Sequence, residues 1–169
     1  HEPSRRQRQM CIRDRAIDKA GKDGAIQIEP ANSSDTSLEL IEGFQIGAGY
    51  LSPQFVTDKR RWTMRHENAL VLVADTILTS VEQIFPVLQI ASRESRPLVI
   101  VAEDIQDQAL AALVMNAVRG TMKVAAIRAP GFGQERRGCI EDLAASVGAT
   151  VLGPVGKQSV AKADISHLG

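Results

Sequence analysis

Acidic side chains follow two apolar segments of this sequence, each at the point where a strand would end. Asp75 closes "ALVLVAD" (69–75), and Glu103 and Asp104 close "PLVIVAED" (97–104). In α/β enzymes, ligands gather outside the carboxyl ends of the strands, where carboxylates can hold a magnesium ion. Asp75 and Asp104 also stand where helix N-caps and turns belong. Since no phosphate loop accompanies them, the sequence favours a structural role, with a magnesium site as the alternative.

A glycine-rich turn, "APGFGQERRG" (129–138), is the second candidate for chemistry. Gly131 and Gly133 follow a strand-like run and precede a helical one, which is the position of a phosphate-binding turn. A dinucleotide fingerprint needs a third small residue where Arg136 stands, and the P-loop lysine pattern is absent. The pattern is therefore interpreted as a strand-to-helix turn. A phosphate site at 130–134 belongs to the alternative, an α/β enzyme.

Cysteine and histidine are too scattered along the sequence for metal or nucleophile chemistry. Cys11 and Cys139 lie far apart without a C-x-x-C motif, and His1, His66 and His167 are equally dispersed. No G-x-S-x-G motif is present. We therefore predict no catalytic residue, no cofactor and no metal site in this chain, and reduced thiols in a cytosol-like compartment.

The elements that must position these residues are short apolar runs that alternate with helical segments. The strand-like runs are 69–75, 97–104, 122–131 and, more weakly, 149–153, and the helical segments are 80–93, 107–119 and 134–147. Strands that are apolar on both faces are buried between helices. The alternation predicts an α/β domain with a mixed, at least partly parallel sheet and flanking helices.

Capping residues mark the predicted helix boundaries. Thr79, with Glu82 three residues later, predicts a capping box at the start of the first helix. Gly120 and Gly148 stand where the second and third helices should end. Pro86 lies inside the first helix, where it removes a backbone donor and indicates a kink or a special packing site.

The helix at 107–119 has almost no polar face. Between Asp107 and Arg119 only Gln108 and Asn116 are polar. Its apolar arc covers about 200°, whereas an ordinary surface helix shows an arc of ~100°. The helix at 80–93 has an apolar arc of about 160°. One stripe of each helix can face the sheet, so the remaining apolar side chains are either covered by a larger core, which is the usual case, or exposed.

Little of the chain remains to cover these helices, and a third strip adds further apolar groups. "GYLSPQFV" (49–56) places Tyr50, Leu51 and Phe55 around a Ser-Pro turn. Two exposed apolar helices and an aromatic loop would form a hydrophobic groove of the kind that binds proteins.

Composition limits the function classes. The chain has 169 residues, 44% hydrophobic and 24% charged, as expected for one main globular domain. Its 20 basic and 20 acidic residues balance, but residues 1–15 hold five arginines and two acids, so the rest is mildly acidic. This argues against a nucleic-acid groove as the main surface. No apolar run approaches the ~18 residues that span a bilayer. We therefore expect neither a nucleic acid nor a membrane as a partner.

Several segments of the sequence converge on one protein family. They are "EGFQIGAGYLSPQF" (42–55), "VADTILTSVEQIFPVL" (73–88), "VIVAEDIQDQALAALVMNAVRG" (99–120) and "KVAAIRAPGFGQERR" (123–137). In order and spacing they resemble the apical domain of group I chaperonins of the GroEL type. The resemblance runs from about Ala16 to Gly169. The segment 57–68 is only weakly similar, and Gln54 stands where the family often has an aromatic residue.

The resemblance implies a molecular chaperone. In that family two helices and a loop line the mouth of a large ring, where they bind non-native polypeptides and, alternately, the mobile loop of the lid co-chaperonin. Carried over by position, the implied substrate-binding residues are Tyr50, Phe55, Phe85, Leu88, Leu110, Val114 and Met115. The apolar surplus of the two helices is then functional.

The resemblance also implies a domain division. Residues 1–15 match nothing, residues 16–41 resemble a small hinge segment of the intermediate domain, and residues 42–169 resemble an apical domain shortened at its C-terminal end. In the family, ATP, magnesium and the ring contacts belong to an equatorial domain that this sequence lacks. We therefore expect a monomeric fragment that is not an enzyme by itself, from a chaperonin of the bacterial cytoplasm or an organelle matrix.

Overall fold

The computed structural model describes residues 14–21, 26, 28, 38, 43, 46–153 and 159–169. The chain divides into two compact units, 1–43 and 44–169. In the first unit, residues 14–20 are helical. Most of the predicted hinge segment at 16–41 and nearly all of the unmatched residues at 1–15 lie outside the described residues.

Strands and helices alternate along the second unit, as the apolar runs predicted. In order, the elements are η1 (Pro53–Phe55), β1 (Leu70–Leu78), α2 (Val81–Glu94), β2 (Leu98–Ile105), α3 (Asp107–Arg119), β3 (Val124–Arg128), α4 (Gly133–Val147), η2 (Val160–Lys162) and η3 (Ile165–His167). The prediction of an α/β fold with flanking helices is confirmed.

The three strands form one parallel sheet in the order β1-β2-β3. A mixed sheet was predicted. Within the described residues, antiparallel pairing is limited to isolated bridges, of which Tyr50 with Ile127 borders β3. The weak fourth run forms only a single parallel bridge, between Leu152 and Ala74 of β1. Gly153 follows at once with a φ of 152°, so the chain leaves the strand conformation there.

The outer edge of β1 is covered by segments from the end of the chain. Leu152 exchanges hydrogen bonds with the backbone of Val73 and Asp75, at N···O distances of 3.0 and 2.7 Å. Gly169 exchanges two more with Val71, at 3.0 and 3.1 Å. This pairing satisfies backbone groups that would otherwise form an open sheet edge.

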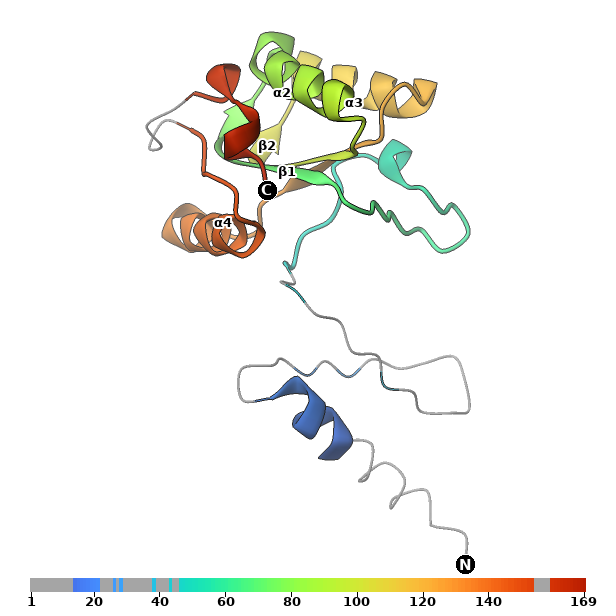
Figure 1. Cartoon of the computed structure of the whole chain (residues 1–169), viewed down its shortest axis with the longest axis vertical. Helices are drawn as coiled ribbons and strands as arrows, with labels where there is room; N and C mark the ends of the chain where they lie inside the picture. Colours follow the sequence, from blue (N-terminus) through green and yellow to red (C-terminus); the bar gives the residue numbers. More distant parts are fainter. Residues whose placement is uncertain are drawn as a thin grey trace, which may run out of the picture. The chain divides into compact units, whose positions relative to one another are not determined.

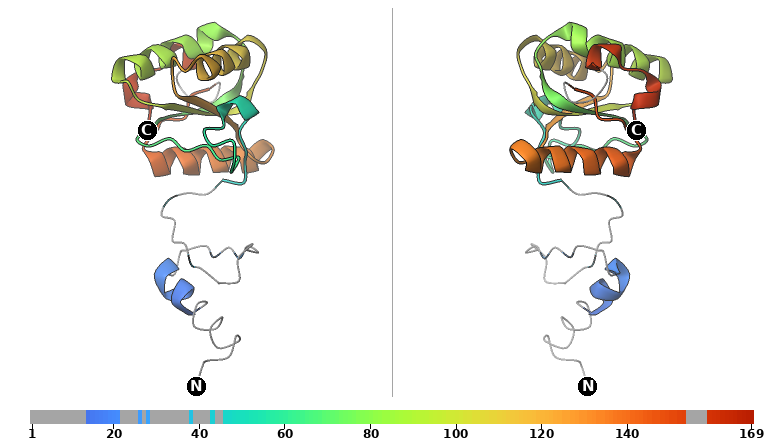
Figure 2. Two further views of the ribbon diagram at one scale, coloured as in Figure 1. Left: turned by 90° about the vertical axis from the view of Figure 1, so that its right-hand side faces the viewer. Right: turned by 90° about the vertical axis from the view of Figure 1, so that its left-hand side faces the viewer.

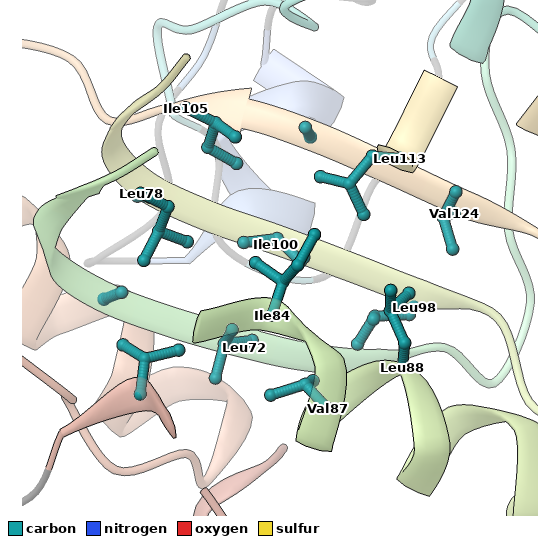
Figure 3. Packing of buried hydrophobic residues seen from close by; sticks show 14 of the residues in the cluster. Leu72, Leu78, Ile84, Val87, Leu88, Leu98, Ile100, Ile105, Leu113 and Val124 are labelled. Atoms are coloured by element: carbon teal, nitrogen blue, oxygen red, sulfur yellow. The ribbon is translucent and has the colours of Figure 1, made fainter. Parts of the chain in front are cut away.

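The sheet lies between two layers of helices (Figures 1 and 2), with α2 and α3 on one face and α4 on the other. Side chains of β1 and β2 alternate between two apolar clusters. Leu72 and Ile100 pack toward α2 and α3, whereas Val73 and Val101 pack toward α4. Figure 3 shows Leu72, Leu98 and Ile100 of the strands beside Ile84, Val87 and Leu88 of α2. Burial on both faces explains why the strands read as continuous apolar runs.

Helix ends follow the predicted chemistry, with one correction. The N-cap of α2 is Ser80, one residue after the predicted Thr79, because Gln83 rather than Glu82 reaches back. Its Oε1 accepts hydrogen bonds from the backbone N–H groups of Thr79 and Ser80, at 3.0 and 3.1 Å. Both predicted glycine stops are confirmed, since the caps of α3 and α4 are left-handed glycines with φ of 66° and 74°. Among the described residues, no helix combines the length and the hydrophobicity that a membrane-spanning segment requires.

Candidate functional site

The helix α3 buries one stripe and exposes apolar side chains on the opposite side. Ala109 and Leu113 are completely buried against the sheet. Met115 is 48% exposed and Val118 is 64% exposed, although both are large hydrophobic residues. A helix that is apolar nearly all round normally lies inside a core. Here the sheet covers only one stripe, so the surplus of apolar side chains predicted from the sequence reaches the surface.

The helix α2 also has a buried stripe, and one of its large apolar side chains is exposed. Ile84 and Val87 are completely buried, and Figure 3 shows both above the sheet. Phe85, between them in sequence, is 53% exposed. Because successive helical residues are 100° apart, Phe85 lies on the flank of the buried stripe.

The starts of α2 and α3 are tied together by backbone hydrogen bonds. The N–H of Gln106 donates to the carbonyl of Leu78 (2.9 Å), and the N–H of Ala109 donates to the carbonyl of Thr79 (3.1 Å). The two helices contact each other on the same face of the sheet (Figure 2). Their exposed apolar side chains therefore lie on the same side of the sheet. We call Phe85, Leu110, Val114, Met115 and Val118 the apolar surface.

The seven residues implied by the family resemblance fall into three burial classes. Phe85 and Met115 are exposed, and Tyr50, Leu110 and Val114 are half-buried. Phe55 is 2% exposed and Leu88 is 9% exposed, and both belong to the core cluster. Because they are buried, Phe55 and Leu88 are suited to support the exposed residues rather than to contact a partner. Val118 of α3 is not in the implied set, although it is the most exposed large apolar residue of the two helices. The sequence pattern marks it as apolar but does not show that it is exposed.

The loop that carries Tyr50 and Phe55 is fastened to the core. Tyr50 forms a bridge with Ile127 of β3, and the N–H of Leu51 donates to the carbonyl of Ala126 (2.9 Å). Phe55 sits in η1, which packs against α3. The predicted aromatic loop therefore packs against α3 and leaves Tyr50 partly exposed.

The sequence placed Asp75 and Asp104 at helix N-caps or turns, but both lie inside strands, and the N-caps of α2 and α3 are Ser80 and Gln106. Each acid of this edge pairs with an arginine. Asp104 pairs with Arg128 (2.8 Å), and Glu103 pairs with Arg136 (2.7 Å). Asp75 pairs with Arg137 of α4 (3.3 Å). Arg128 directly precedes the glycine-rich turn that was weighed as a phosphate site, and Arg136 and Arg137 follow its two glycines.

Asp104 is the most highly connected of these acids. Burial by itself raises the pKa of its carboxyl, but hydrogen bonds from Arg128, from Gln106 and from the backbone N–H of Ile105, together with the charge of Arg128, outweigh it. The net result is a pKa below the ordinary value, so Asp104 is ionised at neutral pH.

This edge also carries a shallow depression of about 340 Å³, lined by both charged and apolar residues: Ile77, Glu103, Asp104, Arg128, Ala129, Pro130, Gly131, Phe132 and Arg136. Its acids are already neutralised by guanidinium groups. Among the described residues, no three His, Cys, Asp or Glu side chains converge as a metal-ion site would require. Arg136 and Arg137 therefore connect α4 to β2 and β1, and Arg128 connects the end of β3 to β2.

Cys139 of α4 is half-buried and unpaired within the described residues. Burial raises the pKa of its thiol, and the nearby carboxylates of Asp142 and Glu135 raise it further. At neutral pH the side chain is therefore a protonated thiol, which is a poor nucleophile.

The apolar surface and the carboxyl edge differ in one respect that bears on function. The acids of the carboxyl edge are paired with arginines, whereas Phe85, Met115 and Val118 on α2 and α3 are exposed. No protein-family model matches this chain. The functional conclusion therefore draws on the geometry and on the sequence resemblance.

Proposed function

We propose that this chain binds apolar segments of non-native polypeptides on the apolar surface of α2 and α3, without chemistry of its own. The observation that carries the proposal is the exposure of Phe85, Met115 and Val118 on two helices whose opposite stripes are fully buried. Exposed apolar groups gathered on neighbouring elements mark protein-binding sites in soluble proteins.

The energetics of such a surface favour breadth over selectivity. Burial of apolar area contributes roughly 25 cal/mol per Å², so a contact of about 400 Å² yields roughly 10 kcal/mol before the costs of association. Met115 has three rotatable bonds and a polarisable sulfur, which lets one surface adapt to many segments. Helical and extended clients can both use it, because area burial has no directional requirement.

The sequence resemblance supports the same function. In GroEL-type chaperonins the corresponding helices bind clients and the lid co-chaperonin. By this proposal the chain is an apical domain of that kind, in the bacterial cytoplasm or an organelle matrix. ATP, magnesium and ring assembly would involve the equatorial domain of the family. The parallel sheet flanked by helices is compatible with this assignment.

Suppression of aggregation tests the proposal. The chain is mixed with a chemically denatured protein on dilution, and light scattering is recorded with the parent, with Phe85→Ser and with Phe132→Ser. Phe132 is a matched control, because it is exposed in the turn before α4. The expected result is suppression by the parent and by Phe132→Ser, and a loss of suppression with Phe85→Ser. Equal suppression by all three proteins would contradict the proposal.

The rival function is an α/β enzyme that holds magnesium or phosphate at Asp75, Glu103, Asp104 and the 130–134 turn. A ligand that binds only the folded state raises the melting temperature. Magnesium with ATP, and magnesium with inorganic phosphate, should therefore raise it under the rival function and leave it unchanged under the proposed one.

A structural role is the third possibility, in which α2 and α3 are covered in an oligomer of this chain. That role predicts a molecular size that rises with concentration, measured by light scattering, and no binding of denatured protein.

A further inference from the structure

A basic hairpin with an exposed tryptophan precedes the sheet, at residues 57–65. Asp58 and Thr63 form an antiparallel bridge, with N···O distances of 2.9 Å from Asp58 to Thr63 and 3.2 Å in return. The N–H of Thr57 also donates to the carbonyl of Thr63 (3.2 Å), and the N–H of Arg65 donates to the Thr57 hydroxyl (3.1 Å). Met64 packs against the core cluster. The hairpin is therefore a defined turn anchored at its base.

The single acid of this hairpin, Asp58, forms hydrogen bonds with backbone groups of the turn. The carboxylate of Asp58 accepts hydrogen bonds from the N–H groups of Arg60 (2.9 Å) and Arg61 (3.3 Å). Within the described part of the chain, no carboxylate lies within ion-pair distance of the side chains of Lys59, Arg60 or Arg61. Residues 57–65 hold four basic side chains and one acid, a net charge of +3 in a molecule whose total is zero.

Trp62 lies at the turn of the hairpin and is the only tryptophan of the chain. It is 63% exposed, and its φ of 55° is in the left-handed region that a bulky residue rarely adopts. Such a conformation costs of order 1–3 kcal/mol and persists where the surroundings impose it, often at binding sites. The hairpin thus holds a large apolar ring in water directly after two arginines, Arg60 and Arg61.

The positive surface continues at the base of the hairpin. Arg65 and Lys123 line a depression of about 240 Å³ together with His66, Glu67 and Pro97. Burial, and then the charge of Lys123, lower the pKa of His66, so His66 adds no charge at neutral pH. Glu67 pairs with Arg65 at 3.5 Å, and both side chains are exposed, so water screens the pair. Lys123 therefore extends the cationic region beyond the hairpin itself.

We propose that the basic hairpin, residues 57–65, binds single-stranded nucleic acid, with the indole of Trp62 stacked on a base and Lys59, Arg60 and Arg61 at the phosphates. Consecutive Cα atoms lie about 3.8 Å apart, so Arg60, Arg61 and Trp62 address a region the size of one or two nucleotides. Base stacking on an aromatic ring and phosphate contacts by arginine are the two components of sequence-tolerant single-strand binding.

Single-stranded nucleic acid fits this hairpin better than the other polyanions. Every nucleotide presents one phosphate and one base face, so both parts of the hairpin are satisfied at any register. An acidic polypeptide could form ion pairs with the basic side chains, but it has aromatic rings for stacking on Trp62 only at scattered positions. An anionic bilayer could also bind the indole. However, Arg61 and Thr63 flank Trp62, so only one apolar side chain of the turn could insert into the bilayer.

This proposal departs from the expectation that no nucleic acid binds. That expectation came from the mildly acidic charge of the chain after residue 15, which opposes a broad groove. Charge within a Debye length of about 10 Å governs a contact as small as this hairpin.

Fluorescence of the single tryptophan tests the proposal directly. The full chain is titrated with a ten-nucleotide oligothymidylate at about 50 mM salt. Stacking should quench Trp62 in a saturable way. For three or four phosphate contacts, the slope of log K against log salt concentration should be roughly −2 to −3.

Two charge-reversal variants separate local from global charge. Arg60→Glu/Arg61→Glu should lower the affinity at least tenfold, whereas Arg93→Glu/Arg119→Glu, with the same change in net charge on exposed helix ends, should lower it little. If the first variant fails to fold by circular dichroism, Arg60→Gln/Arg61→Gln replaces it, with a smaller loss expected. Phe85→Ser should bind as the parent does, which keeps this test independent of the apolar surface.

Competing polyanions supply the outcomes that would overturn the proposal. No quenching by oligothymidylate, or the same affinity in both charge-reversal variants, would refute it. Stronger quenching by polyglutamate would assign the hairpin to acidic polypeptides. Stronger quenching by vesicles of anionic phospholipid would assign it to a membrane surface.

Discussion

Single side chains on α2 and α3 decide whether these helices bind or merely pack. Leu113 is completely buried, whereas Met115, two residues later, is half exposed. Both are large apolar residues in the same helix, so their sequence context is nearly identical. Their different surroundings lead to opposite expectations for substitution.

Replacement of Leu113 by Ala should lower the free energy of unfolding by about 2–5 kcal/mol, because it leaves a cavity under α3. Met115→Ser should change the free energy of unfolding by less than about 0.5 kcal/mol, because its side chain borders water. Urea denaturation measures both. Strong destabilisation by Met115→Ser would mean that this side chain is covered in the folded protein.

Asp104 provides a prediction about pH. Its lowered pKa means that the ionised carboxylate stabilises the folded state above the unfolded pKa of about 4, and that this contribution is lost as pH falls through the folded pKa. Asp104→Asn should therefore be less stable than the parent at pH 7, and the difference should shrink toward pH 3. Thermal unfolding across this range checks the prediction. A difference that grew on acidification would contradict the ion-pair assignment.

Residue type alone could not predict which of the candidate side chains are exposed. The apolar arc of α3 identified a surplus, and the structure places Met115 and Val118 in water. Phe55 and Leu88 have the same apolar character but lie in the core. Exposure depends on which neighbour covers each side of a helix, and periodicity does not encode this.

At the scale of elements, continuous apolar runs and glycine stops predicted the strands and helices well. The run at 149–153 failed as a strand because Gly153 turns the chain away after Leu152 pairs with β1. The capping box shifted by one residue because either Glu82 or Gln83 could occupy the third helical position. Such competition between adjacent polar residues is decided by local backbone geometry.

Gly153 itself gives a prediction at this scale. A Cβ added there would lie 2.7 Å from the carbonyl oxygen of Asp75, and the φ of 152° disfavours any side chain. Gly153→Ala should therefore destabilise the fold by roughly 1–3 kcal/mol. Gly138→Ala is the matched control, since it lies inside α4 with open space around it, and should stabilise by about 0.5–1 kcal/mol. Denaturant midpoints that moved in the same direction would refute this explanation.

At the scale of the whole second unit, chemical character is divided among three regions. The apolar surface lies on α2 and α3, paired charges fasten α4 at the carboxyl edge, and the hairpin at 57–65 gathers four basic side chains against one acid. Composition alone suggested a neutral, ordinary domain. This division arises because the parallel sheet places helices on both faces and gathers the carboxyl ends of the strands at one edge. Averages of composition and charge over the whole sequence do not reveal it.

Binding of a denatured protein to the apolar surface is the most direct test of the proposed function. Fluorescence anisotropy of a labelled, chemically denatured protein would be followed on titration with the parent, with Leu110→Ser and with Phe132→Ser, all checked for folding by circular dichroism. Saturable binding by the parent and by Phe132→Ser, with a loss of affinity in a folded Leu110→Ser variant, is the predicted result. No binding by the folded parent, or equal binding by all three, would contradict a role for α2 and α3 in holding non-native polypeptides.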